Sequence, residues 1–141
     1  MKGMDGMDGE MLYGDITKAV IGCAFEVSNE LGCGFLESVY ENALLMLLRQ
    51  RGFSVKSQCP IKVMFRGECV GDFIGDILVD DNVLLELKAV KVLAPEHHAQ
   101  IINYLNATGI QVGLLINFGP TRLEFDAIPG IEHPIHPLHP C

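Results

Sequence analysis

Residues 71–90 read GDFIGDILVDDNVLLELKAV, and this stretch decides how the rest of the chain is interpreted. The Val, Ile and Leu residues on both sides of Asp80-Asp81-Asn82 predict two antiparallel strands joined by a tight polar turn. If those three residues form the loop, Asp76 lies directly opposite Glu86, with Cβ atoms roughly 5 Å apart. A two-residue turn would place Asp76 on the other face, because a one-residue slip in register turns every side chain over.

Charged residues interrupt this otherwise apolar hairpin at Asp76, Glu86 and Lys88. Glu86 and Lys88 are two residues apart on one strand, so they share a face, and the three-residue turn adds Asp76 to it. Two carboxylates and an ammonium on one face are costly to bury unless they bind something. Carboxylate oxygens suit Mg²⁺ or Mn²⁺, so we expect a divalent cation at Asp76 and Glu86 with Lys88 beside it. The alternative interpretation is a surface ion pair on a half-exposed hairpin.

Length and composition indicate one domain, which we expect to span residues 13–129 of the 141. Residues 1–12 are interpreted as a flexible lead and residues 130–141 as a His- and Pro-rich tail. No apolar run is long enough to cross a membrane and the start lacks a secretory signal, so we expect a cytoplasmic protein. Five cysteines without CxxC spacing argue against a zinc knuckle. The net charge of −8 argues against a general electrostatic interaction with nucleic acid, although it does not exclude a small basic groove at a metal site.

Hydrophobic periodicity predicts two helices, three strands in a meander, a third helix and two final strands. The expected ranges are 16–31 and 36–51 for the first helices, 54–65, 69–79 and 83–90 for the meander, 96–107 for the third helix, and 112–118 and 123–128 for the last strands. Pro60 suggests an edge strand or a bulge. The nearly continuous apolar run 112–118 is typical of a buried strand, which we expect to lie parallel to 83–90. We therefore expect an α/β fold with a central mixed sheet of about five strands flanked by helices.

Two helical motifs carry further candidate residues. Gln100 and Tyr104 are four residues apart and share a face of the helix that follows the Lys88 strand, which places the start of this helix near the carboxylates. Glu37 and Tyr40 share a face in the first turn of the second helix, where a carboxylate also favours the helix dipole. Taken alone, each motif also fits an ordinary amphipathic helix. No P-loop, GxGxxG or recognisable Ser-His-Asp spacing supports nucleotide binding or acyl transfer.

Taken together and in order, these motifs resemble the GxxExxY proteins. The matching segments are GFLESVY at 34–40, VLLELKAV at 83–90, HAQ at 98–100 with YL at 104–105, and GLLINFG at 113–119. The resemblance covers about residues 14–128. That family is placed in the PD-(D/E)XK nuclease superfamily, whose restriction-endonuclease-like core is a mixed sheet flanked by helices. The resemblance implies that Asp76 and Glu86 are metal ligands, that Lys88 is the catalytic lysine, and that Glu37 is an acidic residue near the metal or its waters.

The resemblance also implies a wider site. Gln100 and Tyr104 are similar to the QxxxY element of some nuclease branches, which helps order the site or the substrate, and we assign Tyr104 and Tyr40 to substrate positioning. Two positions depart from the family pattern, which commonly has His where Ser28 stands and Arg where Ile74 stands. We therefore expect a Mg²⁺- or Mn²⁺-dependent nuclease that hydrolyses phosphodiester bonds of DNA or RNA. The alternative, favoured by the acidic charge and the two departures, is an inactive module that binds a protein partner or self-associates.

Overall fold

The computed structural model describes residues 13–130, and every expected helix and strand is present there, with ends displaced by two residues or fewer. The elements in chain order are α2 (Gly14–Leu31), α3 (Glu37–Gln50), β1 (Val55–Phe65), β2 (Glu68–Val79), β3 (Val83–Lys88), α4 (Pro95–Thr108), β4 (Val112–Asn117) and β5 (Glu124–Pro129). The predicted lead 1–12 lies outside the described residues, as does the predicted tail apart from Gly130. None of the described helices is long and apolar enough to cross a membrane.

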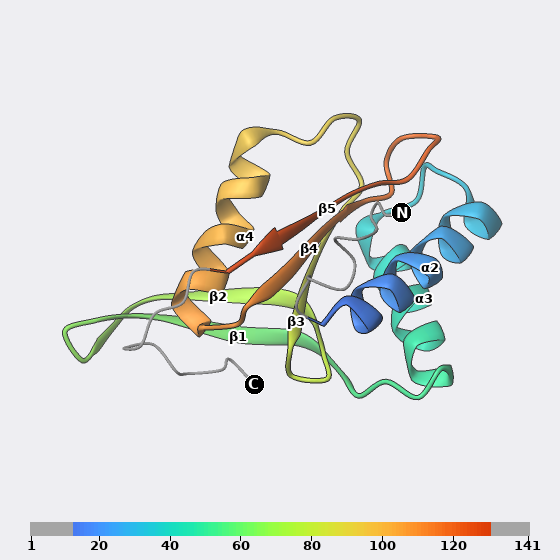
Figure 1. Cartoon of the computed structure of the whole chain (residues 1–141). Coiled ribbons are helices and arrows are strands. Elements are labelled where there is room, and N and C mark those ends of the chain that lie inside the picture. The colour runs from blue at the N-terminus through green and yellow to red at the C-terminus, as the bar shows by residue number, and fades with distance from the viewer. Residues whose placement is uncertain (1–12, 131–141) are drawn as a thin grey trace.

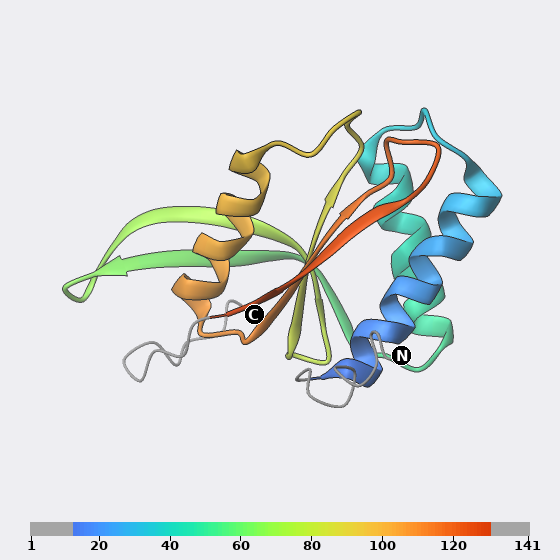
Figure 2. The ribbon, with the colours of Figure 1, turned by 45° about the horizontal axis from the view of Figure 1, so that its top comes forward.

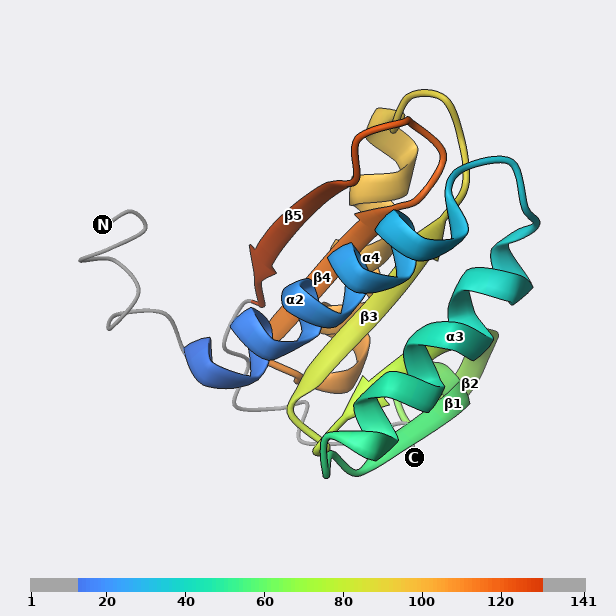
Figure 3. The same ribbon diagram turned by 90° about the vertical axis from the view of Figure 1, so that its right-hand side faces the viewer.

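The five strands form one mixed sheet in the order β1-β2-β3-β4-β5. Neighbouring strands are antiparallel except β3 and β4, which run parallel and are joined by the crossover helix α4. Helices α2 and α3 cover one face of the sheet and α4 covers the other (Figure 1, Figure 3). This arrangement confirms the predicted fold class, and β1, which contains Pro60, lies at an edge as expected.

The central strands are buried on both faces because they are apolar at nearly every position. Leu85 and Leu87 of β3 pack against α2 and α3, whereas Leu84 packs against α4. Gly113 of β4 lets α4 approach closely, since a Cβ there would lie 2.8 Å from Cδ1 of Ile101. Strand alternation then places the charged positions of β3 on the α4 side of a closely packed sheet.

The turn between β2 and β3 contains three residues, as the sequence predicts. Asp80 and Asp81 both adopt positive φ, at 51° and 59°, and the pairing across the turn includes Ile77 with Leu85. Continuing this register puts position 76 opposite position 86. The local turn therefore determines which residues meet at the end of the β2–β3 ladder.

Beyond the region paired with β3, strands β1 and β2 continue as a two-stranded arm, residues 59–75, that projects from the body (Figure 1, Figure 2). Gln58, with φ of 58°, interrupts the alternation of β1 at the point opposite Asp76. On the arm Ile61 and Phe73 face α4, whereas Ile77, an even number of residues beyond Phe73, faces α2 and α3. A left-handed backbone conformation in a residue other than glycine is costly, and such residues cluster at functional sites.

Candidate functional site

Asp76 and Glu86 lie side by side where the pairing of β2 and β3 ends. The backbone pairs reach only Ile77 and Leu85, and beyond them two bonds between backbone and side chain join the strands. The N–H of Asp76 donates to Oε2 of Glu86 at 3.0 Å, and the N–H of Leu87 donates to Oδ2 of Asp76 at 2.7 Å. Each carboxyl is thus anchored to the opposite strand. The three-residue turn has brought these two residues together as the sequence predicts.

The Glu86 carboxyl is almost completely buried, with 3% of the residue exposed. Burial is the largest cause that raises its pKa, from 4.5 to about 8, and the negative charge of Asp76 is the next. The hydrogen bond from the N–H of Asp76 and the positive charge of Lys88 oppose the shift, while Glu37 adds to it. A carboxyl in this position gains strongly from a cation placed beside it.

The pKa of the Asp76 carboxyl is also raised, but less than that of Glu86. Burial is the main reason that its pKa rises from 3.8 to about 6, and the N–H of Leu87 opposes the rise. The negative charges of Glu41 and then Glu37 raise the pKa further, and Lys88 lowers it. Helix α3 therefore brings its carboxylates within electrostatic range of the strand carboxyls, and the resemblance implies such a position for Glu37.

Glu41 is the acidic residue that the sequence reasoning missed. It lies one helical turn after Glu37 on α3, and its charge acts on Asp76 more strongly than that of Glu37. Its Oε2 accepts a hydrogen bond of 2.8 Å from Nε2 of Gln58, the residue that interrupts β1 opposite Asp76. The i, i+4 spacing of two glutamates at the start of a helix was the available signal.

Lys88 ends β3 within electrostatic range of both strand carboxyls, since its positive charge lowers the pKa of each. Asn117 pairs with Lys88 across β3 and β4 and is fully buried. Its side chain binds the backbone of the segment that follows β3. Oδ1 of Asn117 accepts from the N–H of Val90 at 3.0 Å, and Nδ2 donates to the carbonyl of Val90 at 2.9 Å. The sequence reasoning missed this residue too, although a lone amide in the apolar run 112–118 signals it.

On the opposite side of the sheet from α3, helix α4 contributes Gln100 and Tyr104. Nε2 of Gln100 donates to the Tyr104 hydroxyl at 2.9 Å, which confirms that the two side chains lie together. Burial raises the pKa of Tyr104, the bond from Gln100 lowers it, and the charges of Glu86 and Asp76 raise it. The Gln100–Tyr104 pair therefore lies within electrostatic range of the two strand carboxyls.

Tyr40 has a different environment, because its side chain is fully buried. Its hydroxyl donates to the carbonyl of Gly32 at 2.7 Å and accepts from the N–H of Phe35 at 3.2 Å. Its ring stacks on Phe118 with centroids 4.7 Å apart. These contacts hold the loop that leads into α3, so Tyr40 supports the position of Glu37. A role in substrate positioning, acting through that loop, stays a prediction.

The donors at Asp76 and Glu86 fit a small, hard cation. Among the described residues no hydrogen bond engages Oδ1 of Asp76 or Oε1 of Glu86, so one oxygen of each carboxyl remains for a ligand. Within residues 13–130 no three His, Cys, Asp or Glu side chains form a ready-made metal cage. Mg²⁺ is usually coordinated by one or two carboxylates and several waters, which these two side chains can provide, and Mn²⁺ also takes oxygen donors. Structural zinc, by contrast, takes a closed set of four ligands.

Comparison with known proteins places this arrangement in a family. Residues 14–128 match the family described as the PD-(D/E)XK nuclease superfamily. No curated protein matches the chain. Among solved structures, the crystal structure of SSO0001 is similar, with a TM-score of 0.52 and 17% identity over 66% of this chain and 49% of that one. The chain thus spans about half the length of that protein, and the likeness shows the fold alone. The family match covers most of the chain, which therefore belongs to the PD-(D/E)XK nuclease superfamily.

Proposed function

We propose that this protein is a metal-dependent nuclease that hydrolyses phosphodiester bonds of nucleic acid. One observation carries the proposal: the half-buried Asp76 and the buried Glu86 are held together, each bonded to the opposite strand, with Lys88 within electrostatic range. Burial of two adjacent carboxyls destabilises the fold unless a cation or protons neutralise them. Carboxyls whose burial destabilises the fold, and whose raised pKa values suit cation binding, are typical of an active site.

Asp76 and Glu86 would hold Mg²⁺ or Mn²⁺, which when bound stabilises charge on a phosphoryl oxygen and lowers the pKa of a bound water. Glu37 and Glu41 supply acceptors on the α3 side that can orient such waters. The Lys88 ammonium stabilises negative charge that develops on the phosphoryl group during attack. DNA and RNA share this phosphodiester chemistry, so both are candidate substrates.

We further propose that the chain is a member of the GxxExxY group within the superfamily. Support comes from where the four motifs lie in the fold. GFLESVY opens α3 with Glu37, and VLLELKAV is β3 with its continuation. HAQ and YL lie on α4, and GLLINFG is β4 with the turn after it. Glu37 and Tyr104 from these motifs lie within electrostatic range of the carboxyl pair, and β4 pairs with β3. Of the two departures, Ile74 is 51% exposed on the arm, two residues before Asp76, where a side chain can reach a substrate.

A nuclease assay tests the proposal directly. The protein is incubated with single- and double-stranded DNA and RNA in Mg²⁺ or Mn²⁺, alongside Lys88→Ala and the matched control Lys91→Ala, which removes an exposed lysine nearby in the chain. We expect cleavage by the wild type and by Lys91→Ala, and a loss of about 100-fold or more, on the order seen when a charge-stabilising group is removed, in Lys88→Ala. Cleavage that survives Lys88→Ala unchanged rules out this mechanism.

A second candidate is an inactive module of the same fold that binds a protein or a second copy of itself, and the net charge of −8 favours it. Calorimetric titration with Mg²⁺ and Mn²⁺ separates the two, with Glu86→Gln as the control. Metal binding that Glu86→Gln abolishes supports the nuclease. A stable dimer in sedimentation analysis, together with no metal binding and no cleavage, supports the module.

A further inference from the structure

We infer that the groove between the arm and α4 binds an unpaired base, so that the substrate is a single-stranded nucleic acid. The substrate class rests on the proposed nuclease function, whereas the base-binding groove itself is a separate feature. The groove has a volume of about 620 Å³, within the range of about 300–1,000 Å³ that small-molecule sites occupy. The residues that line it come from β1 and β2 on one side and from α4 on the other.

Phe73 has a partly exposed aromatic ring on the arm side of this groove. Phe73 is 46% exposed, and its ring centroid lies 5.6 Å from that of Tyr104 with the planes inclined at 41°, so the two rings are not stacked on each other. Gly71 leaves room for the Phe73 ring, since a Cβ at Gly71 would lie 3.3 Å from it. Exposed aromatic rings bind unpaired bases by stacking, which a paired base inside a duplex cannot offer.

Amide side chains line the α4 side. Gln100, Asn103 and Asn106 follow one another at three-residue spacing along the helix and all border the groove. Among the residues that the structure describes, Oδ1 of Asn106 is one of two buried side-chain oxygens without a hydrogen-bond partner. Amides both donate and accept hydrogen bonds, which suits the mixed donors and acceptors along the edge of a base. An occupant with only apolar groups would leave the Asn106 oxygen without a hydrogen-bond partner.

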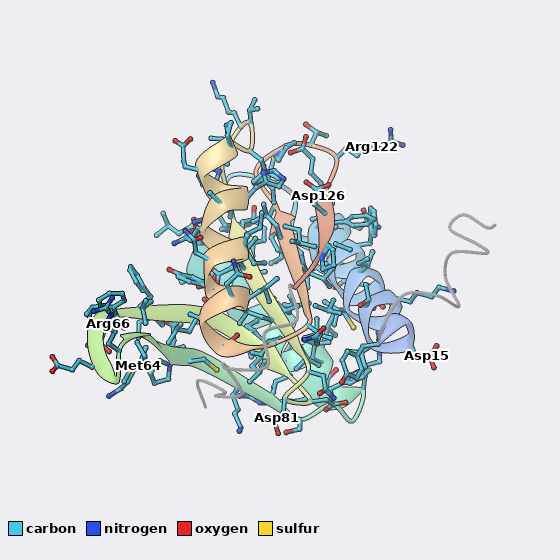
Figure 4. All side chains as sticks on the ribbon, turned by 60° about the vertical axis from the view of Figure 1, so that its left-hand side comes forward. Asp15, Met64, Arg66, Asp81, Arg122 and Asp126 are labelled. Carbon is cyan, nitrogen blue, oxygen red and sulfur yellow. The ribbon has the colours of Figure 1, made fainter. Side chains whose placement is uncertain are left out.

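Charge favours a base over a phosphate as the group held here. The net charge is −8, and Glu96 is the charged residue that borders the groove. Phosphate-based binding depends on Lys and Arg, and the basic residues of the arm, Lys62 and Arg66 near its tip (Figure 4), are not among the residues that line the groove. A substrate recognised through its bases does not need Lys or Arg side chains in the groove to bind its phosphates. Its bases must then be unpaired.

The groove and the carboxyl site lie near each other, since a Cβ at Gly75, two residues after Phe73, would lie 3.5 Å from Oε2 of Glu86. Tyr104 borders the groove and lies within electrostatic range of Asp76 and Glu86. A nucleotide whose base rests against Phe73 can therefore extend its phosphodiester group toward Asp76 and Glu86. Base binding would thus select an unpaired strand and position it for hydrolysis.

Fluorescence anisotropy with a labelled single strand of oligodeoxythymidine tests this inference, with a hairpin duplex as the comparison and EDTA present to prevent cleavage. We expect tighter binding of the single strand than of the duplex. Phe73→Ala should weaken single-strand binding about tenfold, the loss typical of one stacked base. The matched control Phe65→Ala removes an aromatic ring that is 60% exposed on the same arm but outside the groove, and should bind as the wild type does.

The outcomes separate this inference from the proposed function. Equal binding of strand and duplex, or equal losses in Phe73→Ala and Phe65→Ala, overturns the base-binding groove even if Lys88-dependent cleavage is found. Binding that depends on Phe73 without any cleavage supports the groove and contradicts the nuclease. If Phe73→Ala does not fold by circular dichroism, Phe73→Leu keeps an apolar side chain without the ring, and wild-type affinity in that variant also overturns the inference.

Discussion

The Glu86 carboxyl should make the stability of the metal-free protein fall as the pH rises. Its pKa is about 8 in the folded protein and 4.5 in the unfolded chain, so unfolding releases a proton between these values. Raising the pH therefore favours unfolding. The stabilisation from the protonated carboxyl is fully present below pH 4.5 and is lost as the pH passes through about 8.

The magnitude follows from the difference between these two pKa values. A proton released on unfolding lowers the free energy of unfolding by roughly 1.4 kcal/mol for each pH unit that the solution is raised within this window. Replacing the carboxyl in Glu86→Gln removes the proton that titrates and keeps an oxygen that can accept the N–H of Asp76. At pH 8 the variant should be more stable than the wild type by roughly 2–4 kcal/mol, after allowance for an amide N–H₂ without a partner.

Urea unfolding followed by circular dichroism, in EDTA at several values between about pH 5.5 and 8.5, measures this effect. The control is Glu30→Gln, which alters an exposed carboxyl on α2 and should keep the wild-type profile. Adding Mg²⁺ at pH 8 should stabilise the wild type but not Glu86→Gln, because only the wild type keeps both carboxylates for the ion. Asp76, whose pKa is also raised, contributes a slope of its own in the lower part of this window. A wild-type profile that is flat across the window, or an undiminished slope above about pH 7 in Glu86→Gln, would refute the reasoning.

Three further changes test other parts of the site. Asn117→Ala removes both bonds to the chain after β3 and should lower the free energy of unfolding by about 2–4 kcal/mol in urea unfolding, because buried backbone groups lose their partner. Gly113→Ala places a Cβ 2.8 Å from Ile101, so thermal unfolding should show that the free energy of unfolding falls by about 1–3 kcal/mol. Glu41→Gln removes a negative charge that raises the pKa of Asp76, so titration of Asp76 by NMR should occur at lower pH than in the wild type; an unchanged midpoint contradicts the placement of Glu41.

Much of the candidate site was predictable because it depends on short-range sequence. The polar turn at Asp80 sets the register of β2 and β3, and that register brings Asp76 and Glu86 together. The i, i+4 spacing of Gln100 and Tyr104 predicts their contact in the same way. In each case the geometry of a turn or a helix over a few residues determines which side chains meet.

Other parts of the site depend on contacts between distant segments. Glu41 bonds to Gln58 and acts on Asp76 only because α3 packs beside the start of the arm. Asn117 holds Val90 only because β4 lies parallel to β3 after the α4 crossover. Neither contact follows from residue type or spacing, since each joins two elements whose distance is set by the packing of the sheet and its helices.

The sequence alone determined the helices and strands, the resemblance to a nuclease family and, for a three-residue turn, the pairing of Asp76 with Glu86. Alternation, turn length and motif order are properties of neighbouring residues, which is why they could be predicted. The tertiary structure decided how deeply Glu86 is buried, which other carboxylates approach it and where the groove beside Phe73 opens. Desolvation of a carboxyl and the effect of other charges on its pKa act through space. Both therefore depend on the packed layers that distant segments form together.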